Sequence, residues 1–283
     1  MKGRLIGVIL MIIVLGFSTT TFAQRNGQQK EAPAPGPAPR MADGKPDLSG
    51  TWRWEAIGSD PAVVPIELTL WGLDKFNWNI GPETANGVYA GRLTRVELDP
   101  VMHCYPPGLA RLGPPPDGQR ILSQGTIVET GQLDIIQTPG KMIQLYSYGH
   151  EARYIYTDGR DHPKNLQPSW NGDSIGKWEG DTFVVDTIGL RDETWLDGVG
   201  HEHSDKLHIV ERYNRLDSET LEVERTLTDP IALAKPFTTR TVGKLTPETD
   251  FHKAPMVDCK AYMARKPAFG EGINGLLGIN DHP

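Results

Sequence analysis

Residues 206–228 read KLHIVERYNRLDSETLEVERTLT, and this stretch carries the pattern that decides the fold. Polar and apolar side chains alternate along residues 206–215 and again along 220–228, with the turn Leu216-Asp217-Ser218 between them. Alternation with a period of two is typical of a half-buried β-strand, and so short a link joins antiparallel strands. The stretch therefore predicts a β-hairpin. We interpret its charged residues as a polar face paired across the strands: Glu211, Arg212, Glu222, Glu224 and Arg225.

The same pattern recurs along much of the chain. Besides Lys206–Arg215 and Thr220–Thr228, the predicted strands are Leu93–Leu98, Gln119–Glu129, Leu133–Gln137, Met142–Tyr146, Arg153–Thr157, Thr182–Thr187 and Thr238–Leu245. Short turns such as Asp158-Gly159 favour antiparallel hairpins over βαβ crossovers. Leu70–Ile80 predicts a short helix, and no long amphipathic helix is visible. We expect an all-β fold with few short helices, formed by an antiparallel meander that closes into a barrel or curls as an open sheet.

Two Gly-x-Trp motifs precede or enter predicted strands. Gly50-x-Trp52 opens the domain, and Gly176-x-Trp178 lies before the strand at 182–187. The first is similar to the Gly-x-Trp opening of lipocalin-like barrels, and this resemblance implies a tryptophan that plugs the base of the barrel. The alternative is a tryptophan that packs at the end of a sheet beside a turn glycine.

The N-terminus has the order of a secretory signal peptide. Lys2 and Arg4 precede the apolar run Leu5–Phe17, and small residues lead to Ala23. The apolar run is shorter than the roughly 20 residues of a membrane-spanning helix. We therefore expect a periplasmic or secreted protein with no membrane attachment after cleavage. Its predicted parts are a signal peptide at 1–23, a disordered Pro/Ala-rich linker at 24–46, one β-barrel-like domain at 47–266 and a loose C-terminal tail at 267–283.

The net charge limits the classes of binding partner, and the cysteine content predicts a disulfide. The formal net charge is −7, and signal cleavage would remove the positive charges of Lys2 and Arg4. Because no Lys/Arg cluster interrupts this acidic balance, nucleic acid and anionic membranes are disfavoured as partners, and a small-molecule ligand or substrate is expected. The two cysteines, Cys104 and Cys259, predict one disulfide in an exported protein. The sequence leaves the oligomeric state open.

The segment 146–208 concentrates histidine and tryptophan and carries a recurring set of motifs. They are Asp158-Gly159-Arg160-x-His162-Pro163, Pro168-Ser169-Trp170, Ile175-Gly176-x-Trp178-Glu179-Gly180-Asp181-Thr182, Thr194-Trp195-Leu196-Asp197 and His203-Ser204. Together they resemble the signature of a family of uncharacterised secreted bacterial proteins, over most of residues 47–259. This resemblance implies no particular activity, so the chemistry is predicted from the side chains themselves.

These side chains predict an acid–base site with an anion-binding part. The candidate catalytic residues are His150, Asp158, His162 and His203, and the candidate substrate-binding residues are Arg153, Arg160, Trp170, Trp195 and Asp197. On a strand, Arg153 shares a face with Ile155, and an interior guanidinium needs a carboxylate or an anionic ligand. We expect a lyase, isomerase or hydrolase acting on a small organic or sugar-like molecule. Alternatively, Asp158 and Arg160 form a structural pair at a turn.

Three other functions stay open. His201-x-His203 on an extended backbone would point both imidazoles the same way, so a His-ligated divalent metal is one hypothesis, although no cofactor is predicted with certainty. A non-catalytic, lipocalin-like small-ligand binding protein is the second, with tryptophans lining a pocket. A structural protein with scattered histidines is the third. The chain lacks a Gly-x-Ser-x-Gly elbow, a nucleotide-binding glycine loop and a His-Glu-x-x-His motif, which disfavours common serine hydrolases, nicotinamide enzymes and zincins.

Overall fold

The computed structural model describes residues 34–54, 66–80, 99–103, 105–112, 121–123, 126–128, 132–147, 151–197 and 200–247. Several predicted features lie outside the described residues, namely the signal peptide, the strand at 93–98, His150, both cysteines with their disulfide, and the C-terminal tail. Within the described ranges, no helix is long and apolar enough to cross a membrane.

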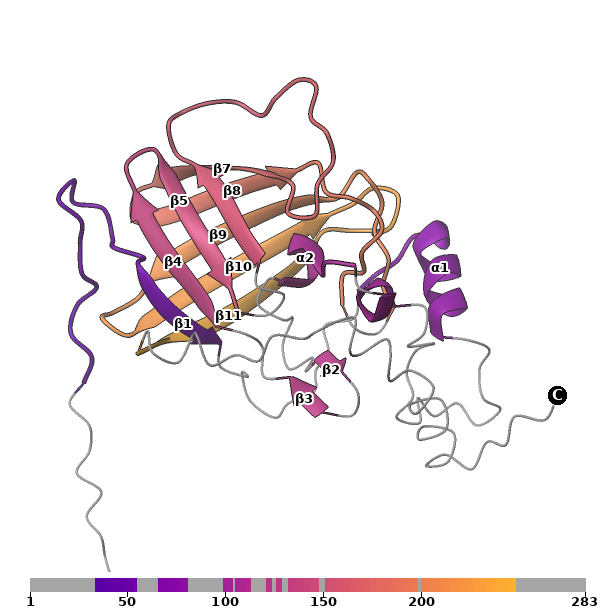
Figure 1. Cartoon of the computed structure of the whole chain (residues 1–283), viewed down its shortest axis with the longest axis horizontal. Helices are drawn as coiled ribbons and strands as arrows, with labels where there is room; N and C mark the ends of the chain where they lie inside the picture. Colours follow the sequence, from indigo (N-terminus) through magenta and orange to yellow (C-terminus); the bar gives the residue numbers. More distant parts are fainter. Residues whose placement is uncertain are drawn as a thin grey trace, which may run out of the picture. The chain divides into compact units, whose positions relative to one another are not determined.

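Nine strands close into a barrel in the spatial order β1-β11-β10-β9-β8-β7-β6-β5-β4 (Figure 1). They are β1 (Gly50–Trp54), β4 (Leu133–Thr138), β5 (Lys141–Tyr146), β6 (Glu151–Tyr156), β7 (Asp173–Glu179), β8 (Thr182–Ile188), β9 (His208–Arg215), β10 (Thr220–Thr228) and β11 (Phe237–Thr246). A separate small sheet pairs β2 (Ile121–Ser123) with β3 (Thr126–Val128). The all-β prediction is confirmed, and the barrel is the architecture that forms.

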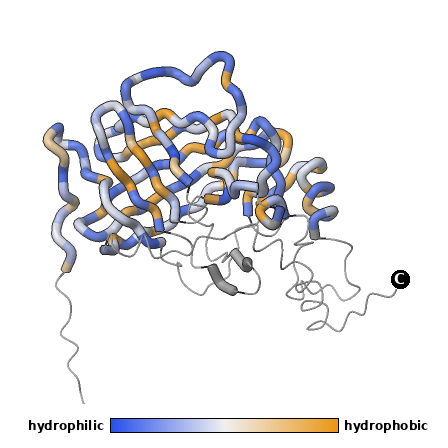
Figure 2. The backbone as a smooth tube through the Cα atoms, viewed as in Figure 1, coloured by the Kyte–Doolittle hydropathy of each residue, from blue (hydrophilic) through white to orange (hydrophobic). Residues whose placement is uncertain are grey.

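Alternation along the strands sets which side chains face the interior. Figure 2 shows hydrophobic and hydrophilic residues alternating along the barrel strands. The predicted hairpin forms, with Glu211 opposite Arg225 and Arg212 opposite Glu224. Two strand predictions differ from the structure. The stretch predicted as one strand at 119–129 contains both β2 and β3. The alternation pattern misses β7, because Ser174 and Gly176 occupy its inward positions in place of large apolar residues.

One strand pair departs from the predicted antiparallel meander. β6 and β7 are parallel, whereas the other eight neighbouring pairs are antiparallel. A closed ring of strands needs an even number of direction reversals, so nine strands close only if a pair runs parallel. A parallel pair also needs a long crossover, and residues 157–172 supply it as the long loop above the strands in Figure 1.

Trp52 lies at the end of the barrel where β1 begins. Its side chain is fully buried, its indole N–H donates to the Leu48 carbonyl at 3.0 Å, and the Arg215 guanidinium lies 5.0 Å from its ring centroid. Gly50 has φ of +130°, and a Cβ there would lie 2.6 Å from Leu245 Cδ1. Glycine is therefore required where the chain enters β1. Residues before 47 also contact the barrel at this end: Arg40 forms a two-pronged ion pair with Asp181, between β7 and β8.

Among the described residues, three short helical elements accompany the barrel: α1 (Leu70–Ile80), η2 (Pro100–His103) and α2 (Gly108–Leu112). The α1 bounds match the prediction, whereas no helix was predicted at α2. The backbone N–H of Leu109 in α2 donates to the Trp170 carbonyl at 3.0 Å. Arg111 forms a buried, two-pronged ion pair with Asp99, at 2.6 and 2.8 Å. These contacts hold α2 against the crossover loop and the η2 segment.

Candidate functional site

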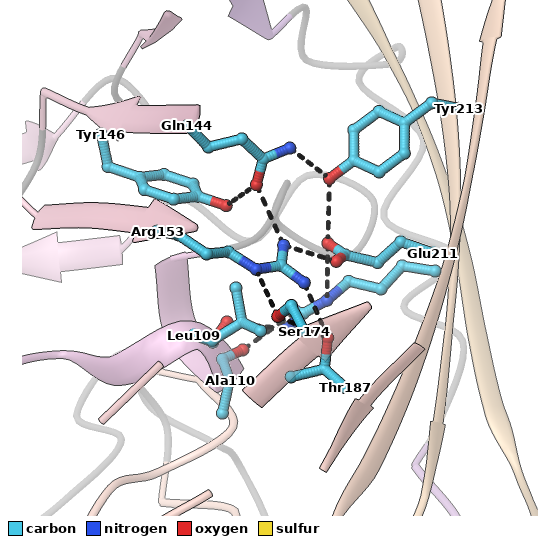
Figure 3. Close-up of polar contacts among 10 residues, drawn as sticks. Leu109, Ala110, Gln144, Tyr146, Arg153, Ser174, Thr187, Glu211 and Tyr213 are labelled. Atoms are coloured by element: carbon cyan, nitrogen blue, oxygen red, sulfur yellow. Dashed lines mark hydrogen bonds and ion pairs between the residues drawn. The ribbon is translucent and has the colours of Figure 1, made fainter. Parts of the chain in front are cut away.

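Polar side chains from the adjacent strands β5 to β10 point into the barrel and form what we call the interior cluster. Its members are Gln144, Tyr146, Arg153, Ser174, Thr187, Glu211, Tyr213 and Arg225. Each is at most 5 % exposed. Figure 3 labels all of them except Arg225. Burial of so many polar groups is unfavourable unless they are hydrogen-bonded to one another, so their contacts determine what the cluster can do.

Arg153 on β6 is the centre of the interior cluster. It donates to Ser174 Oγ at 3.0 Å, to Gln144 Oε1 at 3.0 Å and to Thr187 Oγ1 at 2.7 Å. Its Nη1 also lies 2.6 Å from Glu211 Oε2, which makes a close ion pair. Arg153 therefore faces the interior together with Ile155, and of the two partners considered, a carboxylate or an anionic ligand, a carboxylate of the same chain pairs with it.

Glu211 and Arg225 lie inside the barrel, which corrects their assignment to a polar outer face. Glu211 shares the inward face of β9 with Ile209 and Tyr213, and Arg225 lies directly opposite it on β10. Arg225 Nη1 and Nη2 donate to the carbonyls of Ala110 and Leu109 in α2, at 2.9 and 2.7 Å. Its Nε lies 3.9 Å from Glu211 Oε1 and has no hydrogen-bond partner.

The interior cluster carries more positive than negative charge. Burial raises the pKa of Tyr146 and of Tyr213, so both phenols stay neutral. Burial alone would lower the pKa of Arg153, but the negative charge of Glu211 raises it above its usual value. Burial lowers the pKa of Arg225 despite Glu211, yet an arginine stays charged in proteins. The cluster therefore holds two guanidinium groups and one carboxylate.

Two histidines and two aspartates form a second group, the outer cluster, on the opposite side of the barrel wall. His162 in the crossover lies 2.6 Å from Asp173 Oδ1 through Nδ1 and 2.9 Å from Asp186 Oδ1 through Nε2. His208 Nε2 lies 2.9 Å from the other Asp186 oxygen. Asp186 faces outward because the next residue, Thr187, points into the barrel. His162 and Arg153, predicted as parts of one site, thus lie on opposite faces of the sheet.

The outer cluster makes stability depend on pH through Asp186. Partial burial alone would raise the pKa of Asp186, but hydrogen bonds from His162 and His208 lower it below its usual value. A lowered pKa stabilises the fold above the unfolded-state pKa, and this contribution is lost as pH falls through the folded-state pKa. We expect Asp186→Asn to cost about 1 kcal/mol near pH 7, discounted for partial exposure, and progressively less as the pH falls below about 4.

Urea unfolding of the wild type and of Asp186→Asn across this pH range measures the effect. Asp205→Asn, which removes a carboxylate from an exposed pair with Lys206, is the matched control and should show no such pH dependence. A cost of Asp186→Asn that stays constant from about pH 7 to about pH 3 would contradict the assignment.

The two histidines predicted as metal ligands, His201 and His203, have different hydrogen-bond partners. His201 Nδ1 lies 2.6 Å from Asp197 Oδ2, and its ring stacks on Phe76 of α1 at 4.2 Å. His203 is buried, and burial lowers its pKa, which favours the neutral ring. Its Nδ1 then donates to the Ser204 carbonyl, while Nε2 accepts from Thr194 Oγ1. His203 therefore has no ring nitrogen left for a metal ion, and the described residues contain no group of three suitable ligands.

The remaining predicted site residues lie elsewhere. Asp158 and Arg160 pair with each other on the exposed start of the crossover, with contacts of 2.5 to 3.1 Å, and this ion pair lowers the pKa of Asp158. Trp170 lies beneath the Arg191 guanidinium, 4.6 Å from its ring centroid. Trp195 is buried and forms a β-bridge with Glu202. The described candidates thus occupy the barrel interior, its outer face, the exposed crossover and the loop 194–203.

Several residues of these clusters were not singled out from the sequence as site residues. They are Gln144, Tyr146, Ser174, Thr187, Glu211, Tyr213 and Arg225 inside the barrel and Asp173, Asp186 and His208 outside it. A usable signal was present for Glu211, because a charged residue stands in phase with the apolar Ile209 and the aromatic Tyr213. The partners of His162 gave no such signal, since they come from separate strands.

Fold and site together define a closed, lipocalin-like β-barrel with a charged and hydrogen-bonded interior. A scan of protein-family models and searches of curated proteins and of solved structures return no match for this chain. The family suggested by the motifs of residues 158–204 therefore stays a prediction.

Proposed function

We propose that this protein is a periplasmic or secreted barrel that binds a small molecule in its interior. The observation that carries the proposal is the interior cluster, in which side chains from six adjacent strands converge with hydrogen-bonding groups. Small-molecule sites commonly combine apolar walls with a few convergent polar groups. A barrel of about eight strands has room for packed side chains or for one small ligand, so nine strands suit this function.

The two ends of the barrel suggest where a ligand would enter. Trp52 and Arg215 pack together where β1 begins. At the other end, the five-residue helix α2 contacts the interior cluster through two backbone carbonyls that accept hydrogen bonds from Arg225. Since a short helix is easier to displace than a buried tryptophan, we assign ligand entry to the α2 end. The signal-like N-terminus supports a location outside the cytoplasm.

Native mass spectrometry of the full chain purified after export tests the proposal. We expect a bound small molecule, or binding of members of a metabolite library with a rise in melting temperature. A ligand at about 100 times its Kd stabilises by about 2.7 kcal/mol, which corresponds to several degrees for a domain of this size. If no compound from the extract or the library binds or stabilises the protein, the proposal is wrong.

The same experiment separates binding from catalysis. Asp197 is hydrogen-bonded to Nδ1 of His201, and among the described residues nothing is hydrogen-bonded to Nε2 of His201. A histidine oriented in this way can act as a general base. A carrier returns its ligand chemically unchanged after incubation. Conversion of the ligand, abolished in His201→Asn, would instead show an enzyme whose general base is His201, not one of the predicted catalytic residues His150, Asp158, His162 and His203.

A further inference from the structure

The charge imbalance of the interior cluster points to a negatively charged ligand. Arg153 and Glu211 pair closely at 2.6 Å, whereas Arg225 is 3.9 Å from the same carboxylate. Arg225 is buried, and its two hydrogen-bond acceptors are neutral carbonyls. A buried cation without a close counter-charge is costly, because carbonyl dipoles compensate it only in part. An anion at Arg225 would remove this cost.

The geometry around Arg225 favours a carboxylate over other anions. Nη1 and Nη2 donate side by side to two carbonyl oxygens, and a planar carboxylate offers two oxygens to the same fork. The Nε–H, which has no hydrogen-bond partner, adds a donor on the same guanidinium. The carbonyls of Leu109 and Ala110 therefore occupy the positions that a ligand carboxylate would take.

The surroundings of Arg225 indicate an apolar body for the ligand. The next inward residue on β10 is Leu227, which lies opposite Ile209 on β9 and Phe237 on β11. All three are buried, as is Leu109 of α2. Because these residues follow Arg225 toward the α2 end, a ligand whose charge meets Arg225 would place the rest of its structure among apolar side chains.

We propose that Arg225 binds the carboxylate of an amphipathic monocarboxylic acid, which takes the place of the Leu109 and Ala110 carbonyls and displaces α2. The proposal rests on the proposed function, ligand binding in the barrel, and adds the ligand class and the movement. Gly108, at φ of +68°, starts α2, and a Cβ there would lie 3.0 Å from the Trp170 carbonyl oxygen and 3.1 Å from Thr194 Cγ2. Displacement would break the hydrogen bond from Leu109 N–H to that Trp170 carbonyl.

Calorimetric titration of the full chain with decanoate, decanol and decylamine tests the ligand class. We expect decanoate to bind at least about tenfold more tightly than decanol, since an ion pair with Arg225 adds to the same apolar contacts. Decylamine should bind more weakly than decanol. Hydrogen exchange of residues 108–112 should speed up with decanoate and not with decanol, because only the carboxylate competes with the α2 carbonyls.

Arg225→Met and Arg212→Met form a matched pair of variants. Arg212 lies on β9 but faces outward and pairs with Glu179. Arg225→Met should abolish the preference for decanoate over decanol, whereas Arg212→Met should leave that preference unchanged. If Arg225→Met does not fold, the three-ligand comparison on the wild type still decides the question.

Equal affinity of the wild type for decanoate and decanol would overturn the inference and leave ligand binding in the barrel intact. Unchanged exchange of residues 108–112 on decanoate binding would likewise overturn it. Absence of binding by all three probes would overturn the amphipathic ligand class, and only a further failure of the wider metabolite screen would overturn the proposed function itself.

Discussion

Glu211→Gln is expected to lower the free energy of unfolding by about 3–5 kcal/mol, the range for breaking a buried ion pair by removing one partner. Glu211 is fully buried, and its carboxylate is the counter-charge of Arg153 at 2.6 Å and the nearest one to Arg225 at 3.9 Å. Glutamine has a similar volume and keeps a hydrogen-bonding group, so the loss reports the missing charge. Urea unfolding near neutral pH measures it.

Two further variants make the measurement specific. Glu179→Gln removes a carboxylate from the exposed outer face, where it pairs with Arg212, and should have little effect. Arg153→Met combined with Glu211→Gln should recover part of the loss, because one of the two uncompensated guanidinium groups is then absent. If Glu211→Gln costs no more than Glu179→Gln, the interior ion pair does not exist as described.

Trp52→Ala is expected to cost about 3–5 kcal/mol, the range for truncating a large buried aromatic side chain. The indole is fully buried, donates to the Leu48 carbonyl and lies beneath Arg215. Truncation would leave a cavity at this end of the barrel and remove a cation–π contact. Chemical denaturation gives the change in stability.

The second Gly-x-Trp motif provides the matched control for Trp52. Trp178 is only partly buried and packs against the edge of the core, so Trp178→Ala should cost clearly less than Trp52→Ala. Trp52→Phe should retain most of the apolar contact and lose the hydrogen bond to Leu48, at a cost of about 1 kcal/mol beyond the change in volume. Equal losses for both alanine variants would show that Trp52 has no special role at the barrel end.

Local patterns were sufficient to predict most strands and the main helix. The predicted α1 and β10 have the bounds seen in the structure, and β4, β5, β8, β9 and β11 differ by one or two residues at their ends. The strands among these elements alternate strongly between polar and apolar residues, whereas α1 lacks this alternation. β7 was missed because Ser174 and Gly176 face inward, where Gly176 leaves room for the Phe183 ring. Packing across the barrel, which no local pattern records, sets that requirement.

The candidate site was predicted far less well than the fold. The sequence placed Arg153 on one strand face with Ile155 and required a carboxylate or an anionic ligand for it if that face was interior. In the structure the face is interior and a carboxylate pairs with Arg153. The sequence could not identify Glu211 as that carboxylate, because the two residues lie on different strands and meet only across the interior. The histidines of segment 146–208 lie in separate environments. His162 is hydrogen-bonded to Asp186, whereas His203 is hydrogen-bonded to Thr194.

The sequence by itself determined where most strands lie and that the fold is all-β. Only the tertiary structure decided that the ring closes with nine strands and one parallel pair, that Glu211 and Arg225 face inward, and which charges meet. The physical reason is that alternation with a period of two defines the two faces of a strand, but it does not show which face is buried when both faces carry charged residues. Burial and pairing depend on strands brought together from distant parts of the chain.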